Sequence, residues 1–237
     1  MANRVAVVTG GTRGIGEAIA RRLAVDSFRV YISGTTEKSV RSALQRYAKD
    51  GLLDIHGFPA DARKEDDQKR LIHSAAREGG RLDVLVNNAG LGHFAPVDKL
   101  TPAQFRETLE TNLFGAYYAV HYAAPLMKKN GGGFIVNIAS LAAVNAFAGG
   151  SAYNASKFGL LGFSEAAMLD LRHEGIRMAT VLPGSVDTEF GHPTSGRESS
   201  WMLRPEDVAE AVADLVRFPE RAIASRIDLR PSKPPKR

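Results

Sequence analysis

The residue types best suited to move a proton lie in the second half of the chain. Tyr153 and Lys157 stand four positions apart, so on a helix both side chains project from one face, about one turn apart. An ammonium close to a phenol stabilises the phenolate and lowers its pKa from about 10 toward neutral pH. Such a Tyr can exchange a proton with an alcohol or a carbonyl oxygen. Because this spacing is common on helix surfaces, its meaning depends on the groups around it.

A glycine cluster near the N-terminus has the composition of a diphosphate-binding turn. A short apolar run leads into T-G-G-T-R-G-I-G, residues 9 to 16, and then into an amphipathic stretch. Backbone N–H groups and the dipole at a helix N-terminus favour a diphosphate, provided that no Cβ obstructs its approach. A tight turn can also need glycine for conformation alone, the spacing differs from G-x-G-x-x-G, and a P-loop is excluded because no Gly-Lys-Ser/Thr follows. The cluster predicts a dinucleotide site formed by Gly10, Thr12, Arg13, Gly14, Ile15 and Gly16.

The end of the second predicted strand indicates which dinucleotide binds. A carboxylate there would bond the ribose 2′-hydroxyl of NAD and repel a 2′-phosphate. The chain instead reads Ser-Gly-Thr-Thr, with Gly34 and Thr35 assigned to the cofactor site. Arg13 is placed to neutralise a 2′-phosphate. We therefore predict NADP(H) in preference to NAD(H). Glu37 is the alternative, because a shift of one or two residues in the strand end would bring its carboxylate to the ribose.

Composition excludes several classes of protein. The 237 residues include 31 basic and 26 acidic side chains, a net charge of +5, 44% hydrophobic residues and no cysteine. Disulfide frameworks, cysteine-containing zinc sites and thiol nucleophiles are therefore excluded, and we expect no metal site. The basic residues are dispersed, without the basic and aromatic stripe of a nucleic-acid groove. We identify no signal peptide and no run of about 18 to 20 apolar residues. We expect a cytoplasmic protein that binds neither nucleic acid nor membrane.

Short β-branched runs alternate with longer amphipathic stretches along the whole sequence. This alternation is typical of a parallel sheet whose crossovers are helices. The fold class that we predict for residues 1–237 is a single α/β domain, a doubly wound Rossmann sheet of about seven strands with helices on both faces. The expected strands are residues 4–9, 28–33, 52–58, 82–87, 133–138, 177–182 and one near 227; the expected helices are residues 15–25, 37–49, 64–77, 102–128, 152–173 and 205–217. The Pro-rich tail, residues 231–237, is expected to be mobile.

These motifs, in this order, resemble those of the short-chain dehydrogenase/reductase family over nearly the whole chain, from Thr9 to about Arg230. The resemblance is closest to a 3-oxoacyl-acyl-carrier-protein reductase. The matching motifs are Thr9-Gly-x-x-x-Gly-Ile-Gly16, Asp61-Ala62, Asn87-Asn88-Ala89-Gly90, Asn112, Ser140, Tyr153-x-x-x-Lys157 and Pro183-Gly184. The chain departs from the family at the end of the second strand, which carries neither Arg nor Asp, and at its C-terminus, which lacks a glycine-rich segment.

The resemblance implies a role for each catalytic residue. Tyr153 would be the general acid in reduction and the general base in oxidation. Lys157 would lower the pKa of Tyr153 and bond the nicotinamide ribose, while Ser140 would hold the substrate oxygen. Asn112 would support a proton relay from Lys157 through water.

The resemblance also implies further cofactor contacts. Asp61 and Ala62 would contact the adenine, although Asp61 alone could equally cap a helix. The other implied contacts are Asn88, Ala89 and Gly90 on the adenosine side, and Pro183, Gly184, Val186 and Thr188 around the nicotinamide, with Tyr153 and Lys157 at the ribose.

Substrate selection is expected to depend on a lid loop, residues 189–204, and on nearby side chains. Those side chains are Leu91, His93, Phe94, Phe147 and Trp201; His93 and His192 are interpreted as loop or surface residues. The aromatic-rich stretch 105–127 has more apolar surface than one helix face needs, and the resemblance implies a homodimer or homotetramer built on it and on the Tyr153 helix.

The sequence favours an NADPH-dependent reductase of a small carbonyl substrate, such as a ketone, an aldehyde or a 3-oxoacyl thioester. Two alternatives stay open: an NAD-dependent alcohol or hydroxysteroid dehydrogenase, and a catalytically silent NADP(H)-binding protein. The second is disfavoured, because a protein that only binds has no need for proton-transfer groups.

Overall fold

A computed structural model describes residues 4–190 and 199–235. Its centre is a seven-stranded sheet in which every neighbouring pair is parallel, in the order β3-β2-β1-β4-β5-β6-β7. The strands are β1 Val5–Val8, β2 Arg29–Gly34, β3 Ile55–Pro59, β4 Val84–Asn87, β5 Gly133–Ile138, β6 Ile176–Pro183 and β7 Arg226–Leu229. The sequence-based prediction of a doubly wound Rossmann sheet is confirmed.

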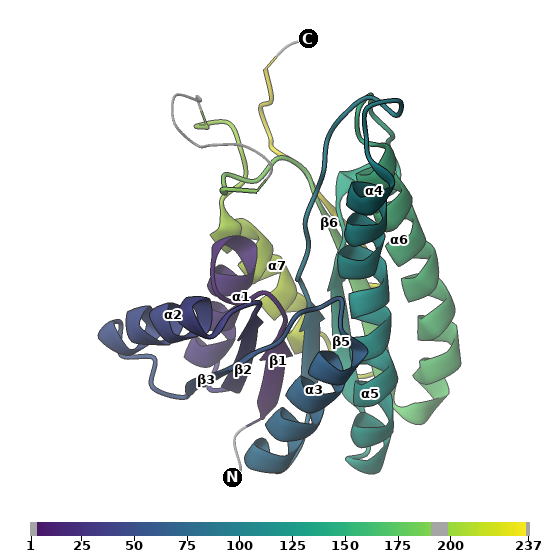
Figure 1. The fold of residues 1–237 in the computed structure, drawn as a ribbon. Helices are drawn as coiled ribbons and strands as arrows, with labels where there is room; N and C mark the ends of the chain where they lie inside the picture. Colours follow the sequence, from purple (N-terminus) through teal and green to yellow (C-terminus); the bar gives the residue numbers. More distant parts are fainter. Residues whose placement is uncertain (1–3, 191–198, 236–237) are drawn as a thin grey trace.

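Helices cover both faces of the sheet (Figure 1). They are α1 Gly14–Val25, α2 Glu37–Lys49, α3 Glu65–Gly79, α4 Pro102–Leu109, α5 Gly115–Lys129, α6 Ser151–Leu171 and α7 Pro205–Arg217. Short turns of other helical types are η1 Glu110–Phe114, η2 Leu141–Ala143 and η3 Arg172–Glu174. In Figure 1, α1, α2 and α7 lie on one side of the sheet and α3, α4, α5 and α6 on the other.

The side chains of β1 show how one strand serves two cores. Ala6 and Val8 belong to the core beneath α1, α2 and α7, whereas Val5 and Val7 belong to the core beneath α3, α5 and α6. Successive side chains of a strand point to opposite faces, so a strand covered on both sides must be apolar throughout. All four residues are fully buried. This is why the predicted strands lack the polar alternation of a half-exposed sheet.

The expected single helix over residues 102–128 is wrong in one respect. It is divided into α4 and α5 by the π-turn η1, which contains Asn112. A π-turn inserts one residue into a helix and changes the direction of the side chains after it. Asn112 is buried there, and its amide bonds groups outside the helix. These bonds give the physical reason for the interruption.

The carboxyl ends of the strands bring the predicted site residues to one edge of the sheet. The chain crosses over between β1 and β4, where the strand order reverses, and open α/β sheets bind ligands at such a point. The loops after β1, β4, β5 and β6 all contribute to the same cavity. Residues 231–235 form no helix or strand, whereas 236 and 237 lie outside the described residues. The mobility of the tail stays a prediction.

Candidate active site

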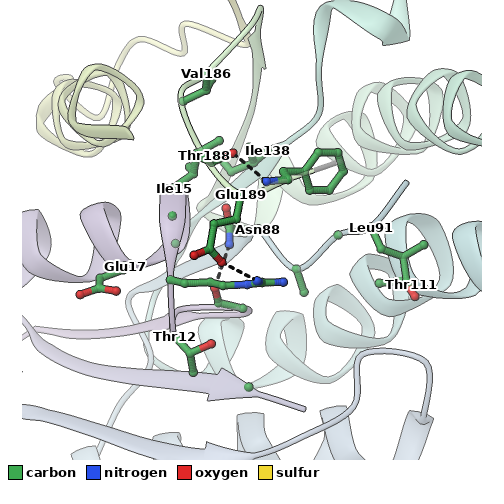
Figure 2. A pocket seen from close by; sticks show the side chains of 18 of the residues that line it. Thr12, Ile15, Glu17, Asn88, Leu91, Thr111, Ile138, Val186, Thr188 and Glu189 are labelled. Atoms are coloured by element: carbon green, nitrogen blue, oxygen red, sulfur yellow. Dashed lines mark hydrogen bonds and ion pairs between the residues drawn. The ribbon is translucent and has the colours of Figure 1, made fainter. Parts of the chain in front are cut away.

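A cavity of about 1620 Å³ lies at this edge. Single small-molecule ligands occupy about 300–1,000 Å³, so the space is large enough for a dinucleotide and a second molecule. Figure 2 shows Ile15 and Glu17 on one side of it and Leu91 and Thr111 on the opposite side. All predicted catalytic and cofactor-binding residues line it except Asn112, which lies behind Leu91.

The glycine loop has the backbone geometry of a phosphate cradle. Gly10 and Gly14 have φ angles of 66° and 55°, which favour glycine. A Cβ atom at Gly16 would lie 2.3 Å from the carbonyl oxygen of Gly10, so α1 can approach the loop this closely only with glycine there. The first turn of α1 receives no capping bond from the side chain of Arg13. The loop therefore suits the diphosphate of a dinucleotide.

Asn88 fixes the loop after β4 to the glycine loop. Its Nδ2 donates to the carbonyl oxygens of Thr9 and Gly10 at 3.0 and 3.2 Å. The hydroxyl of Thr9 accepts from the backbone N–H groups of Asn88 and Ala89, both at 3.0 Å. The two strand ends on either side of the crevice are thus joined, which holds Ala89 and Gly90 at the wall of the cavity.

Helix α2, which follows β2, carries two hydroxyl groups and a guanidinium that line the cavity and were not predicted from the sequence. Arg46 in α2 donates to the carbonyl oxygen of Thr12 at 2.6 Å and to Glu17 at 2.8 Å. Ser39 and Ser42 of the same helix also line the cavity. Ser42 and Ser39 stand four and seven positions before Arg46, which places all three on one helix face; this periodicity is the signal that could have identified them. Arg13 donates to Glu189 at 2.9 Å, across the mouth of the cavity.

Asp61, predicted to contact adenine, is part of a chain of charged groups. Its two carboxylate oxygens accept from Arg63, which also donates to Glu107 at 2.7 Å. The second oxygen of Glu107 lies 2.9 Å from Nε2 of His93. The hydrogen bond from the Arg63 guanidinium to the Asp61 carboxylate holds the pKa of Asp61 below its ordinary value. Ala62 lies beside them in the cavity wall. Arg63 and Glu107 were not predicted, because nothing in the sequence links the two segments.

Ser140, Tyr153 and Lys157 meet at the end of β5. Ser140 is the second residue after β5, and its hydroxyl accepts from the N–H of Ala142 at 3.1 Å. Tyr153 and Lys157 lie in the first two turns of α6, with Nζ of Lys157 at 5.7 Å from the centre of the Tyr153 ring. Nζ donates to the carbonyl oxygen of Ile138 at 2.9 Å. The expected one-face arrangement of the pair is present.

The pKa values in this group differ from the sequence-based expectation. Burial raises the pKa of Tyr153, and a hydrogen bond with Ser140 offsets part of that rise. Burial also lowers the pKa of Lys157 to about 8. The net shift of the Tyr153 pKa is upward, opposite to the expected direction, because desolvation is its largest cause. A phenol with a raised pKa is protonated at neutral pH.

Asn112 is directed at the loop after β4. Its amide exchanges two hydrogen bonds with the backbone of Leu91 and donates to Oγ of Ser156 at 2.9 Å. A Cβ atom at Gly90 would lie 3.2 Å from Oδ1 of Asn112 and 3.8 Å from Nζ of Lys157. These two polar atoms therefore flank the same small space beside Gly90.

The loop after β6 closes the opposite side of the cavity. Gly184, Val186 and Thr188 of this loop line the cavity together with Pro183, the last residue of β6. Val186 forms an isolated bridge with Leu203, so the chain just before the predicted lid segment, residues 189–204, lies beside the end of that segment. Residues 191–198 of that segment, including His192, lie outside the described residues. Figure 2 shows Val186, Thr188 and Glu189 in succession along this wall.

The side chains that were expected to face the substrate do not all lie in the cavity wall. Leu91 lines the cavity and His93 pairs with Glu107. Phe94 and Phe147 contact each other, and Phe94 contacts Tyr153. Phe94, Phe147 and Trp201 all lie outside the cavity lining. Across residues 4–190 and 199–235, no group of three or more His, Asp and Glu side chains could hold a metal ion, and no helix is long and apolar enough to cross a membrane.

Comparison with known proteins gives a consistent result. The model of the family described as short chain dehydrogenase matches residues 4–199. The sepiapterin reductase of Chlorobaculum tepidum is 33% identical over 236 residues, covering 96% of both chains. An alcohol dehydrogenase from the archaeon Thermococcus sibiricus, solved in complex with 5-hydroxy-NADP, is 27% identical with a TM-score of 0.90, covering 99% of both chains. A metagenomic short-chain oxidoreductase, solved in complex with NADP, is 33% identical with a TM-score of 0.84, covering 98% of both chains.

Proposed function

Since the chain belongs to the short chain dehydrogenase family and is an NAD(P)-dependent oxidoreductase, we propose that it reduces a small carbonyl compound to the alcohol with NADPH. The substrate classes considered are ketones, aldehydes and 3-oxoacyl thioesters, the last from the resemblance to 3-oxoacyl-acyl-carrier-protein reductases. One observation carries the proposal: Ser140, Tyr153 and Lys157 meet in the wall of a cavity large enough for a dinucleotide and a substrate.

The residues of the chain supply binding and proton transfer. A bound nicotinamide would supply the hydride. Tyr153 is protonated at neutral pH already at the ordinary pKa of a phenol, and burial raises that pKa further. It gives its proton to the carbonyl oxygen that becomes the alcohol. The Ser140 hydroxyl donates a second hydrogen bond to that oxygen and stabilises the negative charge that develops on it.

Lys157 and Asn112 would restore the proton. With a pKa of about 8, Lys157 can give up and recover a proton near neutral pH. Oδ1 of Asn112 and Nζ of Lys157 flank one space next to Gly90. A water molecule held between them would connect Lys157 to solvent. Asn112 would then position this water and touch no reacting atom.

The side chains at the end of β2 support NADPH over NADH. Thr12, Thr35, Ser39 and Ser42 bring hydroxyl groups to the cavity wall, and Arg13 and Arg46 bring guanidinium groups. The carboxylate of Glu17 is engaged by Arg21 and Arg46. Glu37, the sequence-based alternative, is exposed, pairs with Arg41 at 3.4 Å and lies outside the cavity lining. A 2′-phosphate is favoured by such a set of donors.

The same proposal includes a homodimer or homotetramer. Exposed aromatic and aliphatic side chains occur on α4, η1, α5 and α6, among them Phe105, Phe114, Tyr117, Phe158 and Leu169. Apolar surface gathered on neighbouring elements is typical of protein interfaces. Light scattering coupled to size-exclusion chromatography at micromolar concentration tests this part. A clean monomer would contradict it.

The decisive assay follows cofactor oxidation across a panel of ketones, aldehydes and 3-oxoacyl thioesters, with NADPH and NADH in parallel. We expect consumption of NADPH with at least one class and a lower kcat/KM with NADH. Tight NADPH binding with no turnover of any carbonyl would favour the silent binding protein, and faster turnover with NADH would reverse the cofactor assignment.

A further inference from the structure

Four aromatic rings stand in a row beside the proton donor. The ring centres of Phe147 and Phe94 are 6.0 Å apart, those of Phe94 and Tyr153 are 5.5 Å apart, and those of Tyr153 and Phe190 are 5.7 Å apart. The planes of successive rings are inclined at 39°, 62° and 51°, within the tilted and edge-to-face geometries that aromatic pairs prefer. We call these four residues the aromatic row. It places ring surface on both sides of the Tyr153 phenol.

The row is assembled from three parts of the sequence that lie far apart, one of which supplies both Phe147 and Tyr153. Phe94 follows β4, Phe147 precedes α6, Tyr153 lies in α6 and Phe190 follows β6. Two glycines allow the rings to fold back onto the backbone. A Cβ atom at Gly92 would lie 2.5 Å from the ring of Phe94, and one at Gly150 would lie 2.6 Å from the ring of Phe147. A side chain at Gly92 or Gly150 would therefore occupy the space that the ring of Phe94 or Phe147 fills.

The phenylalanines of the row are not part of a closed core. Phe94, Phe147 and Phe190 are 39%, 48% and 42% exposed, respectively, although each touches another ring. Large apolar side chains clustered at the surface mark binding sites more often than single exposed ones do. The ring of Phe94 contacts the ring of Tyr153, and Tyr153, Phe190 and Ser140 line the cavity. The row therefore continues outward from the side chains at which the proposed function puts the carbonyl oxygen of a substrate.

The charged groups nearby are engaged with one another. The side chain of His93, between Gly92 and Phe94, pairs with Glu107 and so adds no free charge beside the row. Among the described residues, the cations in the cavity wall are Arg13, Arg46, Arg63 and Lys157, and each bonds a protein oxygen. A neutral ring against the row needs no charged partner and leaves all of these bonds in place.

We propose that the aromatic row is an aryl subsite, and that the preferred substrates are neutral ketones or aldehydes bearing an aromatic ring close to the carbonyl group. The inference rests on the proposed reductase function and narrows its substrate class. With the carbonyl oxygen at Ser140 and Tyr153, the aryl group lies against Phe94 and Phe147 in the tilted geometry that the row already uses. An aliphatic ring of the same size fills the space but loses the aromatic contact.

Two ketones of matched size separate these cases. In 1-phenylpropan-2-one and 1-cyclohexylpropan-2-one a methylene group isolates the carbonyl from the ring, so the two carbonyls have similar intrinsic reactivity. We measure kcat/KM for both with NADPH, and the dissociation constant of each for the protein saturated with NADP⁺, a complex that cannot react. Since one aromatic contact corresponds to a factor of about 2 to 12 and the subsite offers two rings, the phenyl ketone should be favoured by about 10-fold in both measurements.

Three variants test the assignment to the row. Phe94→Leu and Phe147→Leu keep apolar bulk and remove a ring, so each should lower the phenyl-to-cyclohexyl ratio by about 3-fold or more. Damage to Tyr153 would lower both activities together and leave the ratio unchanged. Phe218→Leu, at a residue 41% exposed at the end of α7, is the control and should keep the wild-type ratio.

Equal kcat/KM and equal affinity for the two ketones would overturn the aryl subsite. So would Phe94→Leu and Phe147→Leu variants with the same ratio as Phe218→Leu. Butane-2,3-dione, which has no ring, separates this failure from that of the proposed function. If the dione is reduced without any aryl preference, the subsite alone is wrong. If NADPH binds but neither the dione nor either ketone is reduced, the reductase function is wrong.

Discussion

Asn112 and Leu91 exchange two hydrogen bonds: the N–H of Leu91 donates to Oδ1 of Asn112 at 2.8 Å, and Nδ2 donates back to the Leu91 carbonyl oxygen at 2.8 Å. The Asn112 side chain thus pairs with both backbone groups of one residue in the loop after β4, as a residue on a neighbouring strand would. Because Gly90 precedes Leu91, the exchange also fixes the wall between Asn112 and Lys157. The interrupted helix and the loop therefore act as one unit.

We predict that Asn112→Ala destabilises the protein by about 1–3 kcal/mol, because it removes both side-chain partners of the part-buried backbone groups of Leu91. Urea denaturation measures this loss. The control is Asn145→Ala, which removes an exposed side chain and should change stability by less than about 0.5 kcal/mol. Equal stability of the two variants would show that the exchange contributes nothing to the fold.

Gly90→Ala should lower kcat without weakening NADPH binding to a similar degree. The added methyl group would lie 3.2 Å from Oδ1 of Asn112 and 3.8 Å from Nζ of Lys157, in the space assigned to the relay water. Gly90 does not have a positive φ, so the backbone accepts alanine without strain. We expect kcat to fall by at least about 10-fold, as small displacements in a site can cause. A kcat within 2-fold of wild type would contradict the relay.

Lys157→Met should stabilise the protein below pH 8, and this advantage should shrink as the pH rises toward 10. The pKa of Lys157 is about 8 in the folded chain and 10.5 when unperturbed, so between these values unfolding takes up a proton and wild-type stability increases with pH. The change corresponds to about 3 kcal/mol. Urea denaturation of both proteins from pH 7 to 10 measures it, since other groups titrate equally in the two. A pH-independent difference would show that Lys157 is not a buried cation.

The cofactor assignment predicts that Thr35→Asp reverses the preference. Thr35 is exposed at the cavity wall, so a carboxylate there would repel a 2′-phosphate and accept from a ribose hydroxyl. Gly34 is unsuitable for this substitution, because its Cβ would lie 2.5 Å from Cγ2 of Thr12. Calorimetry should show NADPH binding weakened by about 10-fold or more and NADH binding strengthened. In contrast, Glu37→Gln should change neither affinity; a large gain in NADPH affinity there would revive the alternative.

The fold could be predicted almost completely from the sequence, because apolar runs such as Val5–Val8 must be buried on both faces. The interruption at Glu110–Phe114 could not. A π-turn and a continuous helix have the same hydrophobic period over so few residues, and the bonds from Asn112 to Leu91 and Ser156 join segments that no local pattern connects. The predicted ends of some elements also differ from those in the structure. For example, β3 begins at Ile55 and not at residue 52.

The site was predictable where a motif lies within one loop or one helix turn. The glycine loop and the Tyr153-Lys157 pair belong to this class. The bond from Arg46 to Thr12 and the link from Asp61 through Arg63 to Glu107 were not, because these partners are set by packing between elements. The pKa of Tyr153 was predicted in the wrong direction, since spacing shows that a cation is near but not how deeply the phenol is buried.

The central claim is that Tyr153 donates the proton in reduction of a carbonyl by NADPH. The most direct test is a single-turnover stopped-flow measurement of NADPH oxidation by butane-2,3-dione, with wild-type protein and Tyr153→Phe at equal cofactor saturation. We predict rapid oxidation by wild type and a rate at least about 10²-fold lower for Tyr153→Phe, with the dissociation constant for NADPH nearly unchanged. Oxidation by Tyr153→Phe within a few-fold of the wild-type rate would contradict the claim.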